Sequence, residues 1–181
     1  MAISHFPSLA ASGKTKVPYF EADLKNSEED LVGSDIQSGV RLLGASPGFP
    51  VIWEKSDDSS SGIDSHMEFS SEKKAILIKE EGLIQIDGVL AGSLSDSSHR
   101  VLRAFSYITI RRTRGEVSTD YDAGSEAYNR TLVSDKYVQS FGARIRVNKD
   151  DEVQVLAFSH GEVGAYPTVE KGRISITKVL S

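Results

Sequence analysis

The sequence predicts an all-β fold: an antiparallel jelly-roll sandwich with an extended N-terminal arm. Three observations support this prediction. From about Phe49 onward, short runs of β-forming residues are separated by turn-forming segments such as 93–98 and 148–150. Several of these runs alternate apolar and polar residues, as a half-buried strand requires. No amphipathic helical pattern separates the runs, which argues against a parallel α/β sheet and leaves a sandwich or barrel.

Eight strands are expected in this part of the chain. They cover residues 50–54, 67–70, 75–79, 83–91, 101–112, 137–147, 151–160 and 173–179. The clearest alternation follows Tyr137, where Phe141, Ile145 and Val147 share one face. Residues 153–158 are apolar on both faces, which predicts a strand covered on both sides, by its own domain or by a partner chain.

The first 45 residues have a different pattern and are interpreted as an arm, with the jelly-roll domain spanning residues 46–181. The arm contains Pro7, Pro18 and an acidic run at 28–30, and it shows no sustained alternation. Ser27 is a candidate N-cap for a weak helix over the following residues, which two glycines would destabilise. A segment of this kind does not bury enough apolar area to offset its ordering entropy.

The few large apolar side chains of the arm are therefore expected to anchor it in grooves of another chain. These candidate anchors are Phe6, Leu9, Tyr19 and Phe20. In the alternative interpretation, the segment adds an edge strand to its own sheet and belongs to the fold.

Composition excludes several classes of protein. The net charge of -5 argues against sequence-independent binding to nucleic acid. No apolar run approaches the roughly 18 residues that a membrane span needs, so no membrane partner is expected. Cysteine is absent, which removes disulfides and thiolate metal sites and fits a reducing cytosol. The N-terminal residues lack the basic start and apolar stretch of a secretory signal.

The motifs that resemble catalytic or ligand sites lack parts that their chemistry needs. Gly44-Ala-Ser46-Pro47-Gly48 matches a nucleophile elbow, but Pro47 has no N–H for an oxyanion hole. Ser12-Gly13-Lys14-Thr15 lacks the first glycine of a phosphate-binding loop. Residues 120–126 are expected to form a solvated acidic loop, with calcium binding as the alternative. The four histidines show no metal-ligand spacing, so neither an enzyme nor a cofactor is predicted.

Basic residues gather at two places in the chain, Arg111-Arg112-Thr-Arg114 and the pair Arg144 and Arg146. The first interpretation is that these arginines lie on a solvated strand face. The alternative is that they form ion pairs across a subunit boundary.

The order of elements from residue 50 to 181 resembles the tumour-necrosis-factor and complement-like jelly-roll superfamily. The resemblance rests on Pro50-Val-Ile-Trp53, on the step through Gly82 into Leu-Ile-Gln-Ile86, on the long run 101–112, on the hairpin before Asp151-Glu-Val-Gln-Val155, and on the closing Gly172-Arg-Ile-Ser-Ile-Thr-Lys178. It implies a homotrimer packed around an axis through one apolar sheet face. Small jelly rolls of this type without a stalk recur as virion components.

The function predicted from these observations is structural. We expect a trimeric capsid decoration or cement protein, located in the virion and assembled in the host cytoplasm, whose partners are its own copies and a capsid shell. The first alternative is a receptor-binding head of a phage fibre, with loops 57–65 and 113–130 in contact with a glycan or protein. An enzyme on a cupin-like jelly roll would need a His/Glu metal cluster. The expected trimer seam consists of Phe105, Tyr107, Val155 and Phe158.

Overall fold

The computed structural model describes residues 19–25, 48–56, 65–72, 74–94, 103–130, 135–161 and 167–180. For residues 103–105, 122, 124–130, 135, 161 and 180 it describes only the backbone. All elements in the described part are strands: β1 (Tyr19–Leu24), β2 (Phe49–Pro50), β3 (Trp53–Lys55), β4 (Met67–Phe69), β5 (Ile76–Ile78), β6 (Gly82–Leu94), β7 (Arg103–Arg114), β8 (Val117–Arg130), β9 (Asp135–Val147), β10 (Glu152–Gly161) and β11 (Thr168–Leu180).

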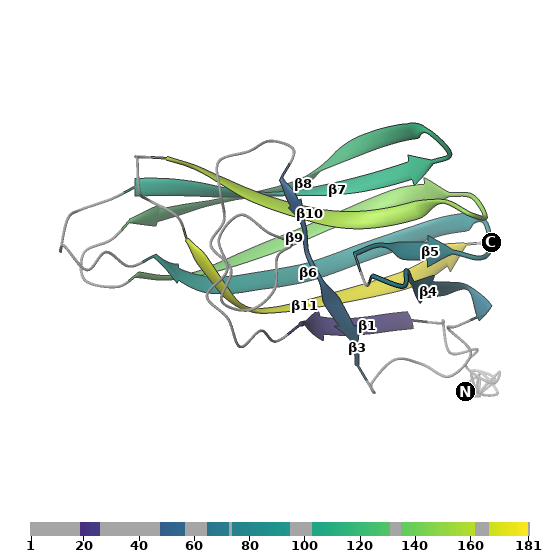
Figure 1. Ribbon diagram of the computed structural model, residues 1–181, viewed down its shortest axis with the longest axis horizontal. Coiled ribbons are helices and arrows are strands. Elements are labelled where there is room, and N and C mark those ends of the chain that lie inside the picture. The colour runs from purple at the N-terminus through teal and green to yellow at the C-terminus, as the bar shows by residue number, and fades with distance from the viewer. Residues whose placement is uncertain are drawn as a thin grey trace, which may run out of the picture.

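The strands form two antiparallel sheets that pack face to face (Figure 1). The five-stranded sheet has the order β3-β1-β11-β6-β9. The six-stranded sheet has the order β4-β5-β10-β7-β8, with β2 paired to β10 beside β5. This arrangement confirms the predicted all-β sandwich.

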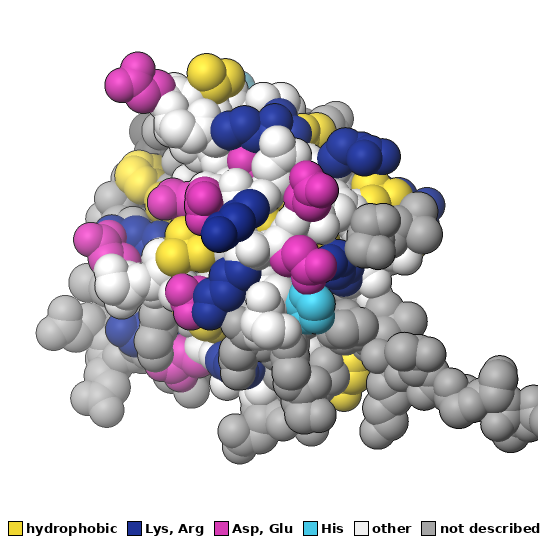
Figure 2. All heavy atoms as spheres, turned by 90° about the vertical axis from the view of Figure 1, so that its right-hand side faces the viewer, with side chains coloured by type: hydrophobic (Ala, Val, Ile, Leu, Met, Phe, Trp, Pro, Cys, Tyr) yellow, Lys and Arg dark blue, Asp and Glu magenta, His cyan; other side chains and the backbone are white. Residues whose placement is uncertain are grey.

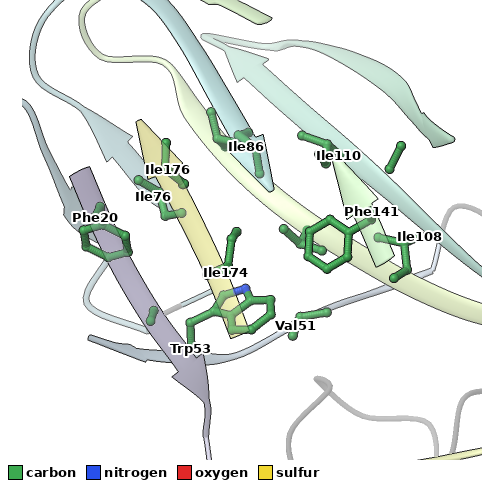
Figure 3. Close-up of a cluster of buried hydrophobic side chains, with 14 of the residues drawn as sticks. Phe20, Val51, Trp53, Ile76, Ile86, Ile108, Ile110, Phe141, Ile174 and Ile176 are labelled. Carbon is green, nitrogen blue, oxygen red and sulfur yellow. The ribbon is translucent and has the colours of Figure 1, made fainter. Parts of the chain in front are cut away.

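The core lies between the sheets and follows from the alternation of the strands. On β11, Ile174 and Ile176 point inward and are fully buried, and Ile86 lies opposite Ile176 on β6. Figure 3 shows these side chains packed with residues of the opposite sheet. The ring of Phe141 occupies the space beside Gly88, where a Cβ atom would lie 2.2 Å from Cζ of the ring. Small and large residues thus interlock across β6 and β9.

The chain closes one side of the sandwich by changing sheets within a few residues. The Val51 N–H donates to the carbonyl of Val155 at 2.8 Å, while Trp53 already belongs to β3 of the other sheet. The crossing segment runs from β10 to β1 in Figure 1. Val51 and Trp53 are both buried. The expected strand at 50–54 is therefore two short strands, since a continuous apolar run hides where the chain changes sheets.

On the opposite side, β8 and β9 lie alongside each other as the outermost strands of their sheets. No hydrogen-bonded ladder joins them in the described part of the chain. The other two outermost strands, β3 and β4, have three residues each. The sandwich therefore exposes little edge that another strand could extend.

Two strands lie where the sequence analysis expected none. Residues 113–130 were expected to form a loop but contain β8, which pairs along most of β7. Residues 19–24 were assigned to the arm but form β1, which lies between β3 and β11. The division at residue 45 therefore does not hold for β1, and this part of the chain belongs to the fold. The expected helix and the anchors Phe6 and Leu9 lie outside the described residues.

Candidate functional site

The described part of the chain contains no cluster of three or more His, Asp or Glu side chains placed to hold a metal ion. Nor do these residues contain a helix long and apolar enough to span a bilayer. The segments 12–15 and 44–47, with their partial motifs, lie outside the described residues. Gly48 does lie within them: its φ of 102° and its close approach to the Ala157 backbone give it a structural role.

Charged side chains of both signs gather at one end of the sandwich, which Figure 2 shows face-on. We call this the hairpin end, because the turns β7–β8 and β9–β10 meet there. Its centre is Asp151, which is fully buried. Arg114 donates to both carboxylate oxygens at 2.7 Å, and the Asn148 N–H donates to one of them at 2.8 Å. These bonds tie the two hairpins together.

The electrostatic environment of Asp151 keeps its carboxylate charged. Burial by itself would raise the pKa of Asp151. The hydrogen bonds from Arg114 and Asn148, together with the charge of Arg112, outweigh burial and lower that pKa. Correspondingly, the hydrogen bond to Asp151 is the main cause of a raised pKa at Arg114.

Arg112 connects the two sheets at the hairpin end. Its guanidinium donates to the carbonyl of Arg146 on β9 at 3.0 Å and to Oγ1 of Thr119 on β8 at 3.3 Å. The same group lies 5.6 Å from the ring centre of Tyr121. One cation therefore links strands from both sheets.

A further set of charges joins β4 to β11 at this end. The Glu80 carboxylate contacts Nδ1 of His66 and lies 2.8 Å from Nζ of Lys178. Hydrogen bonds, first from Lys178 and then from His66, lower the pKa of Glu80. The end of β11 is thereby held against the loop that follows β5.

The clustered arginines find partners within their own chain. Arg111 donates to the two carboxylate oxygens of Asp120 at 2.6 and 2.8 Å, which lowers the pKa of Asp120. Arg144 donates to Gln85 at 3.1 Å. Asp120, expected in a solvated loop, lies in β8 and is engaged by Arg111. These contacts favour arginines on a strand face over pairing across a subunit boundary.

Two outward faces remain as candidate interaction surfaces. The first, which we call the ring face, lies on β7 and β10 around Tyr107 and Phe158. These residues are direct cross-strand partners, and their rings stack with centroids 5.0 Å apart and planes 17° apart. Both side chains are half-buried, and Leu156, which lies between Phe158 and Gln154 on the same face of β10, is 2% exposed, so this face is partly covered.

The second outward face, which we call the valine face, lies on β6 and β9 of the other sheet. Val138 is 70% exposed. Its cross-strand partner is Ala91, and Val89 lies two residues further along β6. Ala91 and Val89 are half-buried, which makes a small apolar patch on a sheet surface otherwise rich in polar residues.

The four residues expected in the trimer seam lie in different surroundings in the structure. Val155 is 2% exposed and packs in the core of its own sandwich, so its assignment to the seam is wrong. Tyr107 and Phe158 come together on the ring face, and their seam role stays a prediction. Phe105 lies in β7 opposite His160, and its side chain is not described.

The two candidate arm anchors that the structure describes also lie in different surroundings. Phe20 is 0% exposed in the core, so its role as an anchor on another chain is wrong. Tyr19 is half-buried and points away from the core, and its anchoring role stays a prediction.

The sequence analysis overlooked Val138, although its position carried a signal: it is an apolar residue among the outward-facing positions that follow Lys136 in β9.

Comparison with known proteins supports the fold. No family model and no curated protein matches the sequence. Among solved structures, Eiger TNF from S. frugiperda has a TM-score of 0.56 at 10% identity, over 90% of this chain and 93% of that one. The globular domain of zebrafish complement 1qA has a TM-score of 0.51 at 18% identity, over 91% of this chain and 98% of that one. At such identities the likeness shows a shared jelly-roll fold.

Proposed function

We propose that this domain is a non-catalytic binding module that assembles as a homotrimer through its valine face. The observation that carries the proposal is the exposure of Val138, which is 70% accessible in a single chain beside Ala91 and Val89. A closed, symmetric oligomer is the usual way to cover such a patch on every copy. The resemblance to tumour-necrosis-factor and complement jelly rolls favours three copies.

The first prediction concerns mass in solution. Light scattering at micromolar concentration is expected to give about three times the chain mass of 19.7 kDa. Val138→Asp should reduce the particle to a single chain, since a buried unpaired carboxylate is costly. Val117→Asp is the matched control, because Val117 is 67% exposed at the β7–β8 turn and is expected to leave the mass unchanged.

Two outcomes would contradict this proposal. A monomeric wild-type protein would exclude the trimer. The second outcome is a Val138→Asp variant that stays trimeric together with a Tyr107→Ser variant that is monomeric. The copies would then associate through the ring face, as the sequence analysis expected. Circular dichroism on each variant distinguishes dissociation from unfolding.

Within this class, we propose that the module is a structural virion protein that decorates a capsid shell and is located in the assembled particle. The small size and the hydrogen-bonded hairpin end support this role. The alternative is the receptor-binding head of a fibre. Quantitative mass spectrometry of purified particles separates the two: a decoration protein matches the shell subunit in copy number, a fibre head is present in few copies, and absence from particles contradicts both.

A further inference from the structure

We draw no further inference here: the strongest candidate, the stacked pair of Tyr107 and Phe158 on the ring face of β7 and β10, carries none, because Leu156 beside these rings is 2% exposed and nothing in the described part of the structure shows what covers it.

Discussion

Replacing Phe20 by alanine is expected to lower the free energy of unfolding by about 4 kcal/mol. The ring is 0% exposed and packs edge-on against Phe69, with centroids 4.9 Å apart. Deleting residues 1–25 should have a larger effect still. It removes the strand between β3 and β11 and the buried side chains of Ala22 and Leu24, and a domain of ordinary stability does not survive such a loss.

Denaturant unfolding, monitored by circular dichroism, measures both changes. Tyr19→Ala is the matched control, since Tyr19 is the adjacent aromatic residue on the outward face of β1, and its replacement should have a much smaller effect. A protein lacking residues 1–25 that melts like the full chain would contradict the assignment of β1 to the sandwich. It would restore the interpretation of this segment as a dispensable arm.

The second large effect is expected at Asp151. Asp151→Ala should lower the free energy of unfolding by about 3 kcal/mol. This value is at the lower end of the loss expected when a buried ion pair is broken, because Arg114 is half-exposed and regains contact with water. The Asn148 N–H also loses its acceptor. Asp120→Ala is the matched control: it removes a carboxylate with the same bidentate geometry but an exposed location, and should lower stability by less than about 1 kcal/mol.

The same residue predicts how stability depends on pH. The pKa of Asp151 is lower in the folded protein than in the unfolded chain, where it is about 3.9, so the unfolded chain takes up the proton first. Its stabilising contribution is therefore complete above that value and is lost as pH falls below about 4. Unfolding curves between pH 7 and 3 should show a smaller acid-induced loss in Asp151→Asn than in the wild type. Equal losses would contradict this assignment.

Strands with regular alternation were predictable because burial on one face leaves a period of two in the sequence. β9 and the second half of β11 illustrate this. The first half of β11 was missed, since the register shift between Val169 and Lys171 interrupts the period. β8 was missed because Asp122, Gly124 and Asn129 are turn-forming types, and its pairing with β7 overrides their local preference.

The candidate surfaces depend on pairings that local patterns do not encode. Tyr107 and Phe158 were both singled out as apolar, yet only the register of β7 and β10 makes them neighbours. The same register places Val155 opposite Ile110 inside the sandwich, which the two-sided apolar run 153–158 did not reveal. Asp151 gave no signal as a buried group, because acidic residues in turns are common and Arg114 lies 37 residues away.

The pairing of β1 with β11 has a consequence for synthesis on the ribosome. The ion pair between Asp23 and Arg173 spans 150 residues, and the two strands are paired throughout this region. A nascent chain therefore makes β1 and its short neighbour β3 early, but the strand that pairs along the other edge of β1 is missing until β11 has left the exit tunnel. During this interval Phe20 and its neighbours are exposed, so folding is completed only after nearly the whole domain has been translated, and chaperones that hold apolar segments have time to bind.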